Sequence, residues 1–354
     1  MNAYLVFEDG DVFPGEWIGT PKMVAGEVVF TTGMTGYQEV MTDPSYAGQI
    51  VTFTYPLIGN YGTVIGESES SAPPCTGVIM SECYSKADLG EWLDQHGVPG
   101  IASVDTRAVV KKIRSKGALR GQITSHPIFT EMEVASPDSV EWVEAVSVDE
   151  PVFHTSSNPH APHIVLIDFG YKASILHALQ ELGCQVTVVP WYWSTKEILD
   201  LKPDGLLFSN GPGDPKALTP WLAGWKSLVK QLPTLGICLG HQVLASAFGA
   251  DTKRLPFGHR GSNHPVRNQL TGEVWITSQN HGYTVSADSL DPAEWVWTHV
   301  HANDGSVEGL AHRIYPVTTV QFHPEAHPGP SDAAGLFRDF VTQVTAKKEV
   351  EVVG

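Results

Sequence analysis

The second half of the chain alternates short apolar runs with amphipathic stretches. Since every predicted strand is followed by a helical pattern, the order indicates a parallel sheet with helices on both faces. Ligands bind such sheets at the carboxyl ends of the strands, so we expect functional residues there. The apolar runs that predict buried strands are 163–168, 185–189, 205–208 and 234–237. The helical patterns between them are 172–182, 195–201 and 216–231.

The first part of the chain consists of β-branched and aromatic runs separated by glycine, as at 26–31 and 49–54. Helical patterns over 86–96 and 106–116 interrupt these runs, which predicts a mixed α+β domain over residues 1–150.

The segment from 126 to 162 is acidic, and its end is rich in Ser, Asn and Pro. This composition is typical of an interdomain connection, so we place a linker at 151–162 and a second domain at 163–350. Strand patterns return after 251, with a hairpin turn at 303–305 between strands over 295–301 and 306–312. A helix over 332–346 is predicted to close the domain.

A single thiol lies where the strand over 234–237 meets the next helical pattern, in Gly236-Ile237-Cys238-Leu239-Gly240. Two glycines permit a sharp strand-to-helix turn. At the start of a helix the thiolate of Cys238 is favoured, and the N–H of Leu239 points to where an oxyanion forms. The pattern therefore predicts a nucleophile at Cys238. The alternative is a buried structural cysteine, which needs no bend on either side.

A base and a residue to orient it follow a second predicted strand, 318–322, as His323-Pro324-Glu325. Proline keeps the residue before it extended, so Glu325 can turn back toward the imidazole of His323. On its own this tripeptide is typical of a surface turn. The tripeptide stands at the end of a predicted strand, beside the strand-to-helix turn at Cys238. This position predicts Cys238, His323 and Glu325 as nucleophile, base and orienting carboxylate.

These motifs resemble those of class I glutamine amidotransferases, over 236–242 and 323–325. Segments in both halves are similar to the small-subunit family of carbamoyl-phosphate synthetase, so the resemblance covers nearly the whole chain. The similar segments are 32–39, 42–46, 55–60, 209–215, 257–259, 263–266 and 279–282. The first three belong to a region that this family has and other amidotransferases lack.

The resemblance implies an α/β fold: a C-terminal class I amidotransferase domain with a mostly parallel sheet flanked by helices, after an N-terminal α+β domain. It implies hydrolysis of glutamine through a γ-glutamyl thioester, and delivery of ammonia to a large subunit that makes carbamoyl phosphate from bicarbonate and ATP. No cofactor is expected in this chain, and ATP and magnesium are expected on the partner. Glutamine-binding residues are implied at Ser45, Gly211, Gly213, Leu239, Gln242, Asn280, Gly282 and Tyr283. Tyr283 stands where the family often has Phe.

Composition narrows the remaining possibilities. The chain has 354 residues, 42% of them hydrophobic, which suggests about two domains. A net charge of −17 disfavours nucleic-acid binding, and no apolar run is long enough for a membrane span or signal peptide, so we expect a cytoplasmic protein. Four cysteines at irregular spacing disfavour a disulfide scaffold.

We expect no metal site. The histidine pairs with spacing closest to that of ligands are His299 with His301 and His323 with His327, and the sequence identifies no third ligand for either. Two other functions stay open: another class I amidotransferase or stand-alone glutaminase, and a non-catalytic binding subunit.

Overall fold

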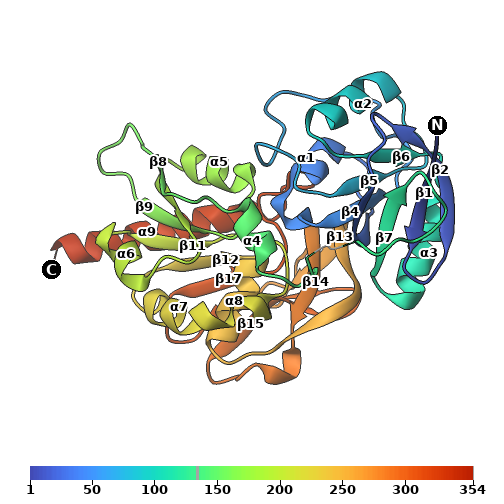
Figure 1. Cartoon of the computed structure of the whole chain (residues 1–354). Helices are drawn as coiled ribbons and strands as arrows, with labels where there is room; N and C mark the ends of the chain where they lie inside the picture. The colour runs from blue at the N-terminus through green and yellow to red at the C-terminus, as the bar shows by residue number, and fades with distance from the viewer. Residues whose placement is uncertain (133–134, 354) are drawn as a thin grey trace.

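The computed structural model describes residues 1–132 and 135–353. Its strands form two assemblies, a closed barrel in the first half of the chain and a ten-stranded sheet in the second (Figure 1). The two halves lie side by side, with the long strands β13 and β14 reaching from the second half toward the barrel (Figure 1). The predicted α/β fold, with an N-terminal α+β part, is confirmed.

The barrel has the strand order β1-β2-β6-β5-β4-β3-β7. Its pairs β3–β4, β4–β5 and β5–β6 are parallel and the others antiparallel. Closure leaves no free sheet edge, and apolar side chains such as Leu5, Ile50 and Ile101 fill the interior. The barrel strands are β1 Asn2–Phe7, β2 Val12–Ile18, β3 Val24–Thr31, β4 Gln49–Phe53, β5 Gly77–Ile79, β6 Gly100–Ala102 and β7 Leu119–Thr124. The helices of this half are α1 Tyr37–Thr42, η1 Pro44–Tyr46, α2 Lys86–Gln95 and α3 Thr106–Lys116.

The second sheet has the strand order β14-β13-β15-β16-β17-β12-β11-β9-β10-β8. Five neighbouring strands, from β17 to β10, are parallel, as predicted. The strands are β8 Val152–His154, β9 His163–Asp168, β10 Gln185–Pro190, β11 Gly205–Phe208, β12 Thr234–Ile237, β13 Thr252–Asn268, β14 Val274–Val285, β15 Trp295–His301, β16 Val307–His312 and β17 Val317–Val320.

Helices cover both faces of the parallel strands (Figure 1). On one face, Ile175 of α5 and Phe337 of α9 pack into one apolar cluster, and on the other, Ile198, Leu228 and Val243 of α6, α7 and α8 pack into a second. Burial on both faces explains why these strands read as continuous apolar runs. The helices of this half are α4 Glu141–Val146, α5 Ala173–Glu181, α6 Thr195–Asp200, η2 Pro215–Trp221, α7 Leu222–Val229, α8 Leu239–Ala247, η3 Ala287–Ser289 and α9 Gly335–Val353.

Three local features differ from the pattern in the sequence. The helix expected over 216–231 is divided into η2 and α7, because Pro220 cannot donate a backbone hydrogen bond inside a continuous helix. The expected connection at 151–162 contains β8, the edge strand of the sheet, which pairs antiparallel with β10. The closing helix α9 extends to Val353, seven residues beyond the expected end at 346.

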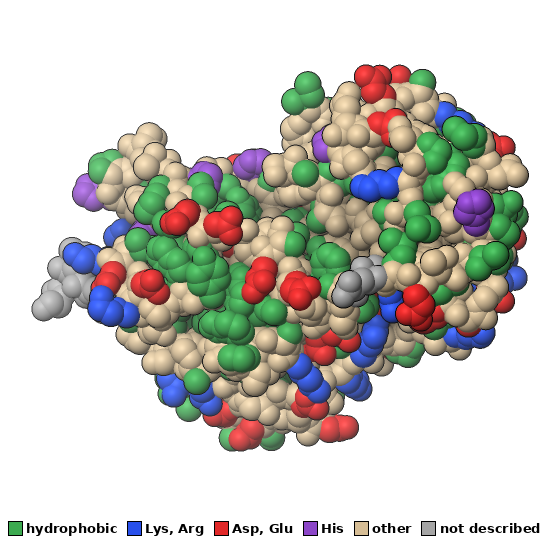
Figure 2. Space-filling view, in the orientation of Figure 1, with side chains coloured by type: hydrophobic (Ala, Val, Ile, Leu, Met, Phe, Trp, Pro, Cys, Tyr) green, Lys and Arg blue, Asp and Glu red, His purple; other side chains and the backbone are tan. Residues whose placement is uncertain are grey.

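Direct contacts join the two halves. The backbone N–H of Thr32 donates to the carbonyl of Arg260 at 3.2 Å, and the rings of Phe30 and Phe257 stack with centroids 6.1 Å apart. Figure 2 shows acidic side chains on both halves of the face in view, in keeping with the net charge of −17. Among the described residues, no helix combines the length and apolarity required to cross a membrane.

Candidate active site

Cys238 lies between β12 and α8, at the carboxyl edge of the parallel sheet. Its backbone has φ 53°, a left-handed value that is uncommon for a residue with a side chain and typical of strained functional turns. Gly240 permits this turn because a Cβ there would lie 2.2 Å from the carbonyl oxygen of Phe208. The strand-turn-helix therefore presents the sulfur at the N-terminus of α8, as the sequence predicts.

His323 lies three residues after the end of β17 and forms an isolated antiparallel bridge with Ser278. Its backbone N–H donates to the carbonyl of Ser278 at 2.9 Å, which fixes the position of the ring. Glu325 turns back, and its Oε1 lies 2.6 Å from Nδ1 of His323. Among the described residues, the other ring nitrogen, Nε2, has no hydrogen-bond partner. Glu325 therefore holds the imidazole by Nδ1 and leaves Nε2 for a reacting group.

A buried lysine completes this group of charges. Nζ of Lys172 lies 3.2 Å from Oε1 of Glu325 and 3.8 Å from Oε1 of Glu69, and it donates to the carbonyl of Ala326 at 2.6 Å. Glu69 comes from the first half of the chain and also accepts hydrogen bonds from the N–H and hydroxyl of Ser174. The carboxylate that orients His323 is thus tied to both halves of the protein.

The electrostatics of this group favour a charged imidazole. Burial disfavours the Glu325 carboxylate, but Lys172 and His323 outweigh it and hold the pKa of Glu325 well below its usual value. Burial also disfavours the His323 cation, yet Glu325 and the neighbouring Cys238 outweigh it and raise the pKa of His323 well above its usual range. At neutral pH His323 is therefore protonated beside Cys238.

A small cavity, of about 40 Å³, lies above the sulfur at the junction of the two halves. Such a volume accommodates on the order of three water molecules. Cys238 is only 2% exposed, and its exposure is toward this cavity rather than the outer surface. Of the predicted glutamine-binding residues, the cavity is lined by Ser45, Gly211, Gly213, Gln242, Asn280, Gly282 and Tyr283. Leu239, the remaining one, is the first residue of α8.

Residues of the first half enter the site through the 3-10 helix η1. Asp43 accepts a hydrogen bond from the N–H of Ser45 with one oxygen and from Nδ2 of Asn280 with the other, at 2.9 and 2.8 Å. Ser45 in turn accepts a hydrogen bond from Nδ2 of Asn210 at 2.9 Å. The structure therefore brings Ser45 into the cavity with Cys238, although the two are far apart in the sequence.

The loop after β11 runs close to the start of α8. A Cβ on Gly211 would lie 2.4 Å from the carbonyl oxygen of Phe169 and 2.9 Å from Cδ2 of Leu239, so only glycine fits there. This close approach brings the backbone of 211–213 beside the first N–H groups of α8. The arrangement suits two backbone donors that converge on one oxyanion.

Two glutamine side chains form a hydrogen-bonded chain that ends at the sulfur of Cys238. Gln242 donates from Nε2 to the carbonyl of Tyr283 at 2.8 Å and to Oε1 of Gln321 at 2.9 Å. Gln321 donates from its own Nε2 to Sγ of Cys238 at 3.6 Å. Gln242 therefore lines the cavity and is one hydrogen bond away from Gln321, the residue that contacts the thiol.

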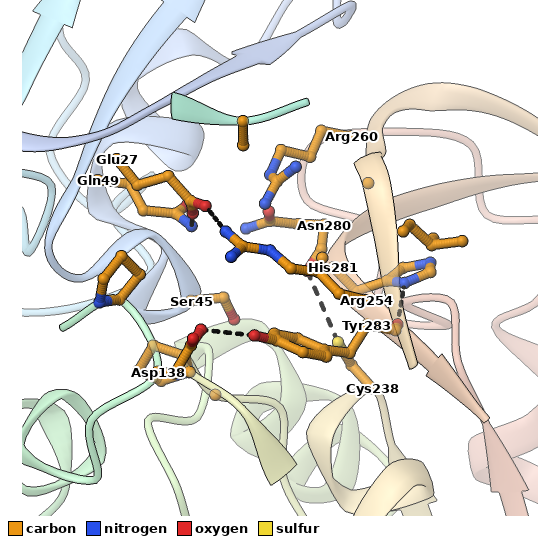
Figure 3. Close-up of a pocket in the computed structure, with 18 of the residues that line it drawn as sticks. Glu27, Ser45, Gln49, Asp138, Cys238, Arg254, Arg260, Asn280, His281 and Tyr283 are labelled. Carbon is orange, nitrogen blue, oxygen red and sulfur yellow. Dashed lines mark hydrogen bonds and ion pairs between the residues drawn. The ribbon is translucent and has the colours of Figure 1, made fainter. Parts of the chain in front are cut away.

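Two polar contacts cross the mouth of the cavity (Figure 3). The hydroxyl of Tyr283 donates to Oδ1 of Asp138, and the guanidinium of Arg254 forms an ion pair with Glu27 of the barrel. Figure 3 shows both contacts spanning the space above Cys238. Both contacts join segments that line the cavity, so they limit the space available above the sulfur.

Sequence reasoning missed Lys172, Glu69, Gln321 and Asp43. Lys172 and Glu69 are polar residues with no motif around them, whereas Asp43 lies in the family-like segment 42–46 and Gln321 in the predicted strand 318–322. The signal for Lys172 is weak: it is a charged residue at the start of a predicted helix. Groups of described side chains that could hold a metal ion lie around His259, and neither Cys238 nor His323 belongs to one.

Comparison with known proteins places both halves of the chain. The model of the class I glutamine amidotransferase family matches residues 165–343, and that of the carbamoyl-phosphate synthase small chain, CPSase domain, matches residues 5–123. The arginine-specific carbamoyl phosphate synthase small chain of Halalkalibacterium halodurans is 49% identical over 98% of each chain. Its namesake from Bacillus subtilis is 48% identical over 99% of each chain, and the carbamoyl phosphate synthase small chain of Listeria monocytogenes is 48% identical over 98% of each. The chain therefore belongs to the carbamoyl-phosphate synthase small chain family, and its second half is a class I glutamine amidotransferase domain.

Proposed function

We propose that the chain hydrolyses glutamine at Cys238 and delivers the ammonia to a large synthetase subunit, which makes carbamoyl phosphate from bicarbonate and ATP. The observation that carries this proposal is the position of Cys238 at a strained strand-to-helix turn, beside an imidazole that Glu325 holds by Nδ1 at 2.6 Å. ATP and magnesium belong to the large subunit in this scheme.

The first step forms a γ-glutamyl thioester. The thiol proton of Cys238 passes to the imidazole of His323, whose raised pKa favours accepting it, and the sulfur attacks the side-chain amide carbon of glutamine. The N–H of Leu239 and the backbone of 211–213 stabilise the oxyanion of the tetrahedral intermediate. His323 then donates its proton to the amide nitrogen, so that ammonia rather than an amide anion departs.

The second step releases glutamate. The departure of ammonia leaves His323 neutral, and its Nε2 accepts a proton from a water molecule that attacks the thioester carbon. The sulfur leaves as thiolate, and the imidazolium beside it restores the starting state. Glu325 keeps the ring in one orientation through both proton transfers, and Lys172 keeps Glu325 ionised.

Substrate recognition is assigned to the cavity above the sulfur. Its lining includes Ser45, Gly211, Gly213, Gln242, Asn280, Gly282 and Tyr283. Since Ser45 comes from the first half of the chain, that half covers the cleft. A covered site suits direct transfer, because ammonia released to water at neutral pH is protonated and loses its nucleophilicity.

We place part of the partner contact on the first half of the chain. Its loop over 61–65 exposes large apolar side chains, with Ile65 fully exposed and Tyr61 and Val64 nearly half exposed. Clustered apolar side chains on a surface mark protein contacts. Ile65→Asp should weaken association with the large subunit, whereas Ile314→Asp, at an exposed apolar position of the second half, should not. Equal association of both variants contradicts this placement.

The test of the catalytic proposal is Cys238→Ser in complex with the large subunit, with the half-buried Cys83→Ser as the matched control. We expect Cys238→Ser to lose glutamine-dependent synthesis of carbamoyl phosphate and to keep ammonia-dependent synthesis, while Cys83→Ser keeps both. Unchanged glutamine use by Cys238→Ser removes the thiol from its role. Full glutaminase activity of the isolated chain, with no stimulation by a large subunit, points instead to a stand-alone glutaminase.

A further inference from the structure

Three histidines meet on the antiparallel side of the second sheet, next to His281, which lines the cavity above the sulfur. His259 and His264 lie on β13, and His301 is the last residue of β15; Asp304 lies in the turn that follows. We call His259, His264 and His301 the histidine cluster. None of them has a role in the proposed hydrolysis of glutamine.

The ring nitrogens of the histidine cluster converge. Nδ1 of His264 lies 3.1 Å from Nε2 of His301, and the rings of His259 and His301 stack with centroids 4.4 Å apart. One nitrogen from each ring lies within 4.8 Å of the other two. Nitrogens bound to one tetrahedral zinc ion at about 2.0–2.1 Å lie about 3.4 Å apart. Small side-chain rotations therefore convert the observed arrangement into a ligand set.

The strands bring these rings together by two irregularities. The register of β13 against β14 shifts between Arg254 and His259 and again between Gly261 and His264. Such bulges redirect side chains that regular alternation would send elsewhere. His301 pairs with Val266 on the adjoining strand, two residues from His264.

Two carboxylates stand behind the rings, as they do around metal-bound histidines. Asp304 places Oδ2 2.9 Å from Nε2 of His259 and Oδ1 3.4 Å from Nδ1 of His301. Glu308, fully buried, has Oε1 3.7 Å from Nδ1 of His259, a nitrogen that is buried without a hydrogen-bond partner. Two carboxylates around three imidazoles favour a cation at this place.

Access to the histidine cluster is limited. His259 and His301 are buried, and His264 is half-buried. Asp304 is about half exposed, which gives an ion access from solvent. A hydrogen-bonded histidine network without metal accounts for the 3.1 Å contact, but not for the two carboxylates around the rings or for Nδ1 of His259, which is buried and has no hydrogen-bond partner among the described residues.

We propose that the histidine cluster binds a divalent transition metal ion, preferentially zinc, with Asp304 on the solvent side of the site. The ion ties β13 to β15 and to the turn at 303–305, so its role is structural. Imidazole nitrogens suit zinc, nickel and copper ions. A site with three nitrogen ligands and one oxygen ligand is typical of zinc, which is a borderline-soft ion. The site could not be identified from the spacing of His299 and His301, because the other two ligands, His259 and His264, come from β13.

The test measures zinc binding to the full-length chain in a Cys238→Ser background, because Cys238 and His323 could themselves hold zinc. The protein is dialysed against a chelator, and ZnCl₂ is then titrated by calorimetry, with the metal content measured after gel filtration. We expect one equivalent to remain bound. His301→Asn and His264→Asn should each weaken binding by about 100-fold and Asp304→Asn by about 10-fold. The matched control is His160→Asn, at an exposed loop position.

The same protein titrated with CoCl₂ gives a second readout that does not depend on how well a variant folds. We expect visible absorption bands typical of tetrahedral cobalt, which added zinc abolishes. The proposal is overturned if the Cys238→Ser chain retains no equivalent of zinc and shows no cobalt bands, or if folded His301→Asn and His264→Asn bind zinc as tightly as the His160→Asn control.

Discussion

Replacing Lys172 by methionine removes a buried positive charge from beside the carboxylate that orients His323. The side chains of Lys172 and Glu325 are 4% and 0% exposed, and their charged atoms lie 3.2 Å apart. Methionine fills similar volume but leaves both Glu325 and Glu69 without their cation. The change therefore tests whether the charge on Lys172 keeps the Glu325 carboxylate ionised.

The size of the effect follows from the distance. At an effective dielectric constant of about 20, unit charges separated by the observed 3.2 Å attract by about 5 kcal/mol. Removing one partner of a buried ion pair lowers the free energy of unfolding by about 3–5 kcal/mol, because the other charge stays buried without compensation. Since one pKa unit corresponds to about 1.4 kcal/mol, the pKa of Glu325 should rise by about 3. The carboxylate would then titrate near the pH range in which activity is measured.

The assay is the rate of glutamate release from glutamine as a function of pH, with urea unfolding of the same variants. For Lys172→Met we expect a fall in kcat larger than any change in KM, and an acid limb of the pH profile shifted upward by about 2 pH units or more. Lys216→Met is the matched control, because Lys216 pairs with Asp251 at 2.8 Å with both side chains more than half exposed. Exposed ion pairs of this kind contribute little to the free energy of unfolding. Identical pH profiles and unfolding free energies for the two variants would refute the reasoning.

Three further changes probe separate parts of the site. Tyr283→Phe removes the hydroxyl that donates to Asp138, so we expect the free energy of unfolding to fall by about 1 kcal/mol. We also expect faster amide hydrogen exchange over 135–140. Unchanged exchange in this segment contradicts a role of the Tyr283–Asp138 contact in holding it over the cavity. Gly240→Ala puts a Cβ 2.2 Å from the carbonyl oxygen of Phe208, which should cost about 3 kcal/mol and abolish glutamine hydrolysis, and an active, equally stable variant argues against the tight turn. Glu325→Gln tests pH dependence: the folded-state pKa of Glu325 lies below the usual 4.5, so its stabilisation is complete above that pH and is lost as the pH falls. The variant should show a flatter decline in stability below about pH 5 than the parent, measured by urea unfolding from pH 3 to 6.

Much of the second half could be predicted because its signals are local. Strands buried on both faces read as apolar runs, and helices on both sides of the sheet follow from the alternation. The turn at Cys238 was identifiable because Gly236 and Gly240 stand beside it, and the structure shows that a Cβ at either meets backbone within 3 Å. The hairpin of β15 and β16 carried its turn residues in the sequence.

The remaining features depend on contacts between distant segments. Lys172 meets Glu325 across 153 residues, and Asp43 meets Asn280 across 237, so no local pattern marks either pair. Barrel closure likewise depends on the pairing of β1 with β7, which short β-branched runs do not specify. The histidine cluster was missed because the two bulges of β13, rather than regular spacing, bring its rings together.

The most direct measurement is mass spectrometry of the complex quenched in acid while it turns over glutamine. We expect a fraction of the chain to carry one added γ-glutamyl group, to map to the peptide that contains Cys238, and to disappear when the thioester is cleaved with hydroxylamine. Cys238→Ser should show no such labile addition. An unmodified Cys238 during rapid turnover, or the same addition on another residue, would contradict a catalytic thiol at this turn.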